Sequence, residues 1–273
     1  MTTSIHRPAG TLELGLARGG VELKTFFRQK EAVVFTFSLP VVLLVILGTL
    51  FSGEVVGTGI TVGTLFTAGM IAAGIASTSF VNLGISIATD RDDGTLKRLR
   101  GAPMPAASYF VGKVVLVLVA SLAEAAIVVG IGWLLFDLAL PAELGRWITF
   151  AWVFGLGVTA CSLLGIAASS LARSARSAPA VMNLPYLVLM FVSGIYFIPL
   201  SSLPQPLIQI GSLFPFKWMA QGFRSVFLPD ALVEQEVAGA WEHGRVALVL
   251  AAWCIGGLVL CLTTFRWRSR RDS

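Results

Sequence analysis

Residues that could carry out chemistry are sparse in this 273-residue sequence. The two histidines, His6 and His243, lie far apart along the chain. The pair Gly112-Lys113 has Ala107 and Val114 where a phosphate-binding Walker A loop needs Gly and Ser or Thr. We therefore expect no catalytic residue and no metal site, and any nucleotide hydrolysis would require another chain.

One acid stands out because of its apolar surroundings. Glu124 is the only charged residue between positions 114 and 136. A carboxyl in the middle of a membrane span is costly unless it is paired or hydrated, so it usually faces a bundle interior or a cavity. Glu124 could contact a substrate, carry a proton or brace a neighbouring helix, and the sequence leaves these roles open. Asn82 and Asn183 are further candidates for the same interior.

The elements that position these residues are expected to be membrane-spanning helices. The chain is 56% hydrophobic and 13% charged, with a mean hydropathy of +0.83, whereas a soluble domain has about 45–50% and about 25% respectively. Crossing about 30 Å of hydrocarbon takes roughly 20 apolar residues. The charge-poor intervals predict six spans, at residues 33–52, 61–83, 109–135, 147–171, 179–198 and 246–265. The expected fold is an all-α integral membrane protein, with one domain over residues 1–273.

Lysine and arginine are distributed unevenly about these six spans. Only Arg146, Lys217, Arg224 and Arg245 fall on the side opposite the termini. The positive-inside rule therefore predicts that both termini are cytoplasmic. Because orientation accounts for the net charge of +5, the main argument for a nucleic-acid partner disappears, and none is expected.

Two segments outside the spans have patterns of their own. Residues 12–31 carry apolar residues at helical spacing with bases between them, which predicts an interfacial amphipathic helix that Gly19 and Gly20 break or start. A solvated tail is the alternative. Residues 200–229 are apolar but interrupted by prolines, which predicts two short re-entrant helices in the outer leaflet.

The segment at residues 90–104 is the most charged loop between spans. Asp92 or Asp93 is expected to cap a helix that contains Leu96 and Leu99 and stops before Pro103. Acids at its start and bases at its end complement the helix dipole. We expect a short ordered helix at the membrane surface, and the alternative is a turn that only carries orienting charge.

The stretch "DRDDGTLKRLRGAPMPAASYFVGK" resembles the cytoplasmic loop of ABC-2 type (type-2 exporter) ABC transporter permeases, whose pattern reads roughly E-R-E-x-G-T-L-x-x-L-x-x-S/T-P, then G-K. The matching residues are Arg91, Gly94, Thr95, Leu96, Leu99, Pro103, Gly112 and Lys113, whereas Asp90, Asp92 and Ala102 depart from the pattern. The later stretch "SGIYFIPLSSLP…PF…GFR" also follows the family at Ser193, Gly194, Pro199, Leu203, Pro204, Pro215, Gly222 and Arg224. The chain is most similar to bacterial drug-exporter permeases of the daunorubicin-resistance type.

This resemblance implies a permease subunit of the bacterial cytoplasmic membrane that works in a complex. It would pair with a second permease subunit, identical or paralogous, and with two copies of an ABC ATP-binding subunit that hold ATP and Mg. The exported substrate would be an amphiphile, such as a drug, an antibiotic or a lipid, and membrane lipid would surround the spans.

The resemblance also assigns roles to segments. Residues 90–104 would be a coupling helix seated in the ATPase, with contacts from Arg91, Asp93, Gly94, Thr95, Leu96, Arg98, Leu99 and Arg100. The substrate path would run between the subunits, with Asn82, Glu124, Asn183, Tyr186 and Phe197 as candidate lining residues. An outer gate is expected at Pro199, Pro204 and Pro215.

Two other classes of function are kept as alternatives. A proton-coupled secondary transporter would use Glu124, but such folds often consist of two related halves, and no convincing repeat is found here. A non-transporting membrane scaffold or assembly factor is the third class.

Overall fold

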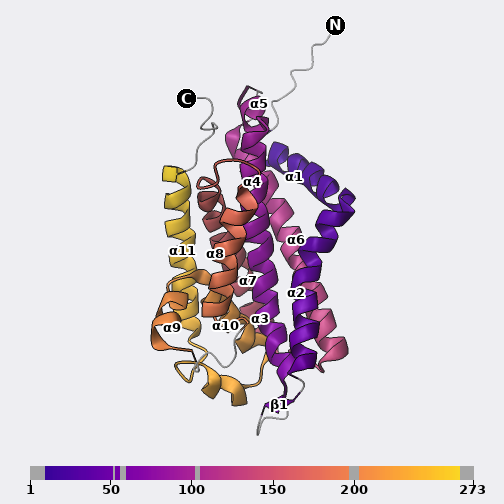
Figure 1. Cartoon of the computed structure of the whole chain (residues 1–273), viewed down its shortest axis with the longest axis vertical. Helices are drawn as coiled ribbons and strands as arrows, with labels where there is room; N and C mark the ends of the chain where they lie inside the picture. Colours follow the sequence, from indigo (N-terminus) through magenta and orange to yellow (C-terminus); the bar gives the residue numbers. More distant parts are fainter. Residues whose placement is uncertain (1–9, 52, 56–59, 102–104, 197–202, 265–273) are drawn as a thin grey trace.

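The computed structural model describes residues 10–51, 53–55, 60–101, 105–196 and 203–264. These residues form an elongated bundle in which most helices run along the long axis (Figure 1). The elements in chain order are α1 (Thr11–Arg28), α2 (Lys30–Leu50), β1 (Glu54–Val55), β2 (Ile60–Thr61), α3 (Val62–Ala76), the π-helix η1 (Ser77–Asn82), α4 (Leu83–Asp92), α5 (Thr95–Gly101), α6 (Ala106–Leu135), α7 (Leu144–Ser169), α8 (Ala178–Val192), α9 (Gln205–Ser212), α10 (Pro215–Phe227), the 3-10 helix η3 (Asp230–Gln235) and α11 (His243–Thr264).

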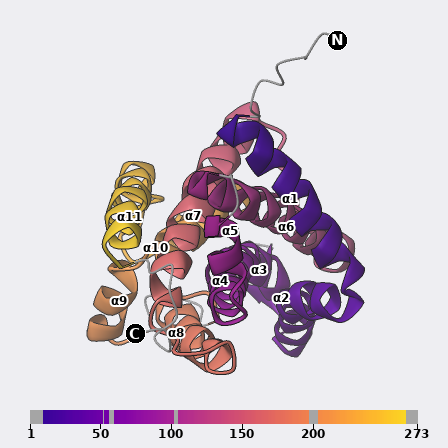
Figure 2. The same cartoon turned by 90° about the horizontal axis from the view of Figure 1, so that it is seen from above.

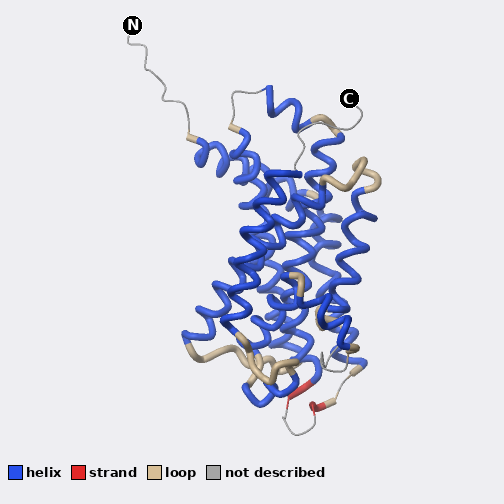
Figure 3. The backbone as a smooth tube through the Cα atoms, turned by 90° about the vertical axis from the view of Figure 1, so that its left-hand side faces the viewer, coloured by secondary structure: helices blue, strands red, loops and turns tan. Residues whose placement is uncertain are grey.

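The two ends of the bundle differ in what they contain. One end holds α5, the start of α6 and the last turns of α11, and we call it the α5 end. The opposite end, the β1 end, holds the antiparallel pair β1–β2 together with α9 and the loops around it (Figure 3). Helices account for most of the described backbone and strands for very little of it, so an all-α membrane fold is confirmed.

Each of the six predicted spans corresponds to a helix of the bundle. Five are long and apolar enough to cross a membrane: Val33–Leu50, Val62–Asp92, Ala107–Leu135, Leu144–Ser169 and His243–Thr264. The predicted span at 179–198 corresponds to α8, which is apolar but has only 15 residues and contains Pro185. At 1.5 Å per residue α8 is about 22 Å long, which is less than the hydrocarbon thickness of a bilayer.

The central helix consists of α3, η1 and α4, which run without a break from Val62 to Asp92. It is nine residues longer at its C-terminal end than the predicted span at 61–83. It packs against α2, α6, α7, α8 and α10, and the view along the bundle axis places it in the interior (Figure 2). Small residues such as Gly74 and Gly84 let neighbouring helices approach it closely.

Helix α1 lies across the bundle rather than along it (Figure 2). It is one continuous helix through Gly19 and Gly20, so the predicted break at these glycines is wrong. Gly19 is a packing residue instead, because a Cβ there would lie 2.8 Å from Val115 of α6. The chain bends only at Gln29, with φ −86° and ψ 82°, before α2 begins.

Candidate functional site

The turn between α4 and α5 is built around Gly94. This residue has φ +73°, a left-handed conformation that glycine adopts without strain. Its carbonyl accepts the backbone N–H of Arg98 at 3.1 Å and so begins α5. Asp92 belongs to the last turn of α4, where Oδ2 accepts from the backbone N–H of Ala175 at 3.0 Å, and Asp93 is the C-cap of α4. The prediction that Asp92 or Asp93 caps α5 is therefore wrong.

The residues predicted to contact an ATPase divide into a buried and an accessible group. Arg91 is only 8% exposed, and its guanidinium donates to the carbonyls of Ser169 and Ala172, at 2.8 Å each. Leu96 is 1% exposed and belongs to the core. These two side chains attach the segment to the bundle. Asp93 and Arg98 are exposed, Gly94, Thr95 and Leu99 are half-buried, and the side chain of Arg100 lies outside the described part of the chain.

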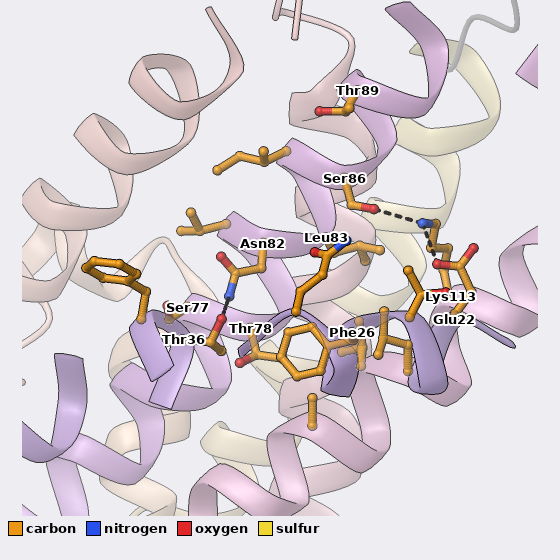
Figure 4. Close-up of a pocket in the computed structure, with 18 of the residues that line it drawn as sticks. Glu22, Phe26, Thr36, Ser77, Thr78, Asn82, Leu83, Ser86, Thr89 and Lys113 are labelled. Atoms are coloured by element: carbon orange, nitrogen blue, oxygen red, sulfur yellow. Dashed lines mark hydrogen bonds and ion pairs between the residues drawn. The ribbon is translucent and has the colours of Figure 1, made fainter. Parts of the chain in front are cut away.

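Directly beyond α5, a buried lysine joins three helices. Lys113 of α6 is 2% exposed, and its Nζ lies 3.0 Å from Glu22 Oε2 of α1 and 2.9 Å from Asp90 Oδ2 of α4. Nζ also donates to the hydroxyl of Ser86 at 2.8 Å (Figure 4). Burying charges in a low dielectric is tolerated when each is paired and hydrogen-bonded, and both conditions hold here.

Two more side chains complete this arrangement. The hydroxyl of Tyr109 donates to Asp90 Oδ2 at 2.8 Å. The guanidinium of Arg18 lies 5.0 Å from the centre of the Tyr109 ring and pairs with Glu22 at 3.0 Å. We call Arg18, Glu22, Asp90, Tyr109 and Lys113 the ion-pair cluster. Sequence reasoning missed it as a unit, although the spacing of four residues in Arg18–Glu22 and Tyr109–Lys113 fits a shared helix face.

A pocket of about 580 Å³ lies beside the ion-pair cluster. It is lined by residues of α1, α2, the central helix and α6, and by Asn183 of α8. Its wall contains both phenylalanine and leucine side chains and hydroxyl and amide groups. Its charged lining residues are Glu22, Asp90 and Lys113. This volume and this mixed lining are typical of small-molecule sites, and they suit a ligand with apolar and polar parts.

The π-helix η1 supplies much of the polar wall. Ser77, Thr78 and Asn82 all belong to it and all line the pocket (Figure 4). Short π-helical segments within α-helices often occur at functional sites. The side-chain amide of Asn82 donates to the Thr36 hydroxyl of α2 at 3.2 Å. Asn183 also lines the pocket, and its amide donates to its own helix at the Pro179 carbonyl.

The other predicted path residues lie deeper. Glu124 is 1% exposed, and its Oε2 accepts from the Thr78 hydroxyl at 2.5 Å. Tyr186 is buried, and its hydroxyl donates to the carbonyl of Ala73 at 3.1 Å. Neither of them lines the pocket directly. Phe197 lies outside the described residues.

At the β1 end, α9 and α10 contain two of the predicted gate prolines. Pro204 is the N-cap of α9, and Pro215 is the first residue of α10, where proline suits helix geometry. Pro199 lies outside the described residues. Every residue of α10 is buried, including Lys217, whose ammonium donates to the Ser212 hydroxyl at 2.7 Å and whose pKa is lowered by burial.

A buried ion pair fixes α10 to the loop that follows it. Arg224 donates through Nε and Nη2 to the two carboxylate oxygens of Glu236, and both side chains are 5% exposed. Two parallel hydrogen bonds of this kind set the orientation of both groups. The ion pair therefore holds α10 to the loop after η3, at the opposite side of the bundle from α5.

Comparison with known families matches residues 20–228 to the family described as ABC-2 type transporter. The match covers more than half of the chain and includes α5, the pocket, α9 and α10, and all members of the ion-pair cluster except Arg18. No curated protein matches the chain. Family membership, together with five helices long enough to span a membrane, identifies the chain as a multi-pass membrane permease subunit of the ABC-2 type transporter family.

Proposed function

We propose that this permease is the membrane half of an ATP-driven exporter that moves amphiphilic compounds, such as drugs, antibiotics or lipids, outward from the cytoplasm or the inner leaflet. The observation that carries the proposal is the position of the pocket. It lies between helices that the ion-pair cluster joins, next to the turn from which α5 projects. A displacement of α5 would therefore reach the pocket through a continuous helix.

The proposed energy source is a separate ABC ATP-binding subunit, present in two copies, that holds ATP and Mg. Family membership implies such a partner. The α5 end would be cytoplasmic, with both chain termini, in a bacterial cell membrane. The contact surface for the ATPase would be the exposed side of α5, including Lys97 and Arg98, together with Asp93 at the end of α4.

The buried residues of segment 90–104 would transmit movement from α5 to the bundle rather than contact the ATPase. Arg91 is held by two carbonyls at the end of α7, and Leu96 is enclosed by the core. Force applied to α5 would therefore move α4, and with it η1 and the pocket wall. The ion-pair cluster would make α1 and α6 follow, because both helices are paired to α4 or to each other through Lys113.

A second permease subunit, identical or paralogous, would complete the substrate path. Exposed apolar side chains on α8, such as Leu184, Leu187 and Phe191, offer a surface for it or for lipid. The α9–α10 segment, with Pro204 and Pro215, would form the outer gate. Family membership favours this ATP-driven exporter over a proton-coupled transporter that uses Glu124.

The test is co-purification followed by ATP-dependent uptake of a fluorescent amphiphile into inside-out vesicles. The double variant Lys97→Glu/Arg98→Glu is expected to lose the ATP-binding subunit and ATP-dependent uptake, while its amount in the membrane stays at the wild-type level. The matched control is Lys24→Glu/Arg28→Glu, which makes the same charge change at exposed positions of α1 and is expected to retain both. Wild-type co-purification of the α5 variant would refute the assigned contact surface.

A further inference from the structure

The part of the pocket at Thr78 lies next to Glu124. Lys113, Val117 and Ala120 of α6 line the pocket at helical spacing, and Glu124 continues the same row four residues later. At 1.5 Å per residue, Glu124 lies about 16 Å along α6 from Lys113. Thr78 lines the pocket, and its hydroxyl donates to Glu124 Oε2 at 2.5 Å. Thr78 therefore stands between the pocket and the carboxyl.

The carboxyl of Glu124 is incompletely satisfied. Among the residues that the structure describes, Oε1 has no hydrogen-bond partner, and no lysine or arginine lies within ion-pair distance of either oxygen. The carboxyl fits here because position 74 is glycine, since a Cβ at Gly74 would lie 2.7 Å from Glu124 Cδ. The fold thus makes room for a buried acid, and the part of the chain that the structure describes gives it one hydrogen-bond donor, the Thr78 hydroxyl.

The two acids that line the pocket are already compensated. Glu22 and Asp90 both pair with Lys113, and Arg18 pairs with Glu22 as well. The two acids and two bases of the ion-pair cluster balance, so the cluster offers no unmatched charge to a ligand. The unmatched acid next to the pocket is Glu124.

We propose that Glu124 binds the cationic group of the substrate, so that this permease prefers amphiphiles that carry an amine or another cation at one end. The ammonium would leave the pocket wall beside Thr78 and reach the Glu124 carboxylate there. The apolar body would lie against Phe26, Phe35 and Leu39, which line the same pocket. This inference rests on the proposed function, because it takes the pocket as the substrate site.

Binding can be measured on the full-length permease in phosphatidylcholine nanodiscs, without an ATPase and without ATP. One probe is diaminododecane labelled with nitrobenzoxadiazole at one end, and the other is the same molecule with its free amine acetylated. Wild-type protein is expected to bind the amine about tenfold or more tightly than the acetylated probe, as a hydrogen bond to a charged group supports. Glu124→Gln is expected to abolish this preference while its affinity for the acetylated probe is unchanged.

Unchanged binding of the acetylated probe also shows that Glu124→Gln is folded. Thr78→Val frees Oε2 and provides a second variant, for which the preference is expected to exceed the wild-type value. A preference that persists in Glu124→Gln, or one that Thr78→Val leaves unchanged or lowers, would overturn the proposal. Equal weakening of both probes in Glu124→Gln would also overturn it and assign Glu124 to bracing η1 against α6.

An acid at the other end of the pocket serves as the control. Glu22→Gln changes a carboxyl that already pairs with Lys113, so it is expected to lower the preference much less than Glu124→Gln does. A preference that disappears in Glu22→Gln and persists in Glu124→Gln would place the cation at the ion-pair cluster and contradict the assignment. Because no ATP is present, failure of ATP-driven transport and failure of cation binding are read in separate experiments.

Discussion

Two regions beside one pocket each bury an ionisable side chain, Lys113 and Glu124, to a similar depth but provide for it differently. At the α5 end, Lys113 is 2% exposed and has Glu22, Asp90 and Ser86 within hydrogen-bonding distance. Beside Thr78, Glu124 is 1% exposed and has the Thr78 hydroxyl as its partner among the described residues. Burial alone therefore does not distinguish them. The difference lies in the partners. Lys113 links helices through its ion pairs, whereas Glu124 keeps hydrogen-bonding capacity for a ligand.

The largest effect is expected from breaking the compensated region. Lys113→Met would leave Asp90 without its base and Glu22 with Arg18 alone, which should lower the free energy of unfolding by up to about 3–5 kcal/mol. Denaturant unfolding in detergent micelles measures this loss. Glu124→Gln replaces an acid that has no base partner among the described residues and should lower stability far less. Equal losses for the two variants would remove the contrast between the regions.

A smaller effect is expected from the attachment of α4 to α7. Arg91→Met removes two charged hydrogen bonds to the carbonyls of Ser169 and Ala172, which should cost about 1.5–3 kcal/mol of unfolding free energy. The matched control is Arg98→Met on α5, whose side chain is exposed and whose removal should leave the unfolding midpoint unchanged. If the two variants unfolded alike, Arg91 would not anchor the segment.

Crowding of the Glu124 carboxyl should change the unfolding free energy by a comparable or smaller amount. Gly74→Ala places a Cβ 2.7 Å from Glu124 Cδ, so the carboxyl must move, at a cost of about 1–3 kcal/mol. Gly130→Ala in α6 meets nothing within 4 Å and should stabilise the helix by up to about 1 kcal/mol. In thermal unfolding, Gly74→Ala should lower the melting temperature and Gly130→Ala should raise it. A raised melting temperature for Gly74→Ala would show that the carboxyl is not confined.

The fold was predictable because long charge-free runs determine membrane-spanning helices almost independently of context. The helix over 95–101 and the burial of Glu124 also follow from local pattern and composition. The length of α8 could not be predicted in this way, because the hydrophobic run continues past Val192. The helix ends there, and the chain turns at Ser193 and at Gly194, whose φ is +67°.

Pairings between helices were beyond what local pattern contains. Lys113 and Glu22 are 91 residues apart and meet only because glycines let α1 pack closely on α6. The same holds for Arg91, which the family resemblance predicted to contact an ATPase but whose side chain donates to carbonyls at and just after the end of α7. For Asp92, the acceptor group was recognised, but its donor lies 83 residues away at Ala175.

ATP-dependent uptake of the two nitrobenzoxadiazole probes into inside-out vesicles, with the ATP-binding subunit present, tests the central claim most directly. The account predicts that wild-type vesicles accumulate the free amine faster than the acetylated probe, and that Glu124→Gln vesicles still accumulate the acetylated probe but no longer distinguish the two. Glu124→Gln vesicles that keep the wild-type preference for the amine would contradict the account.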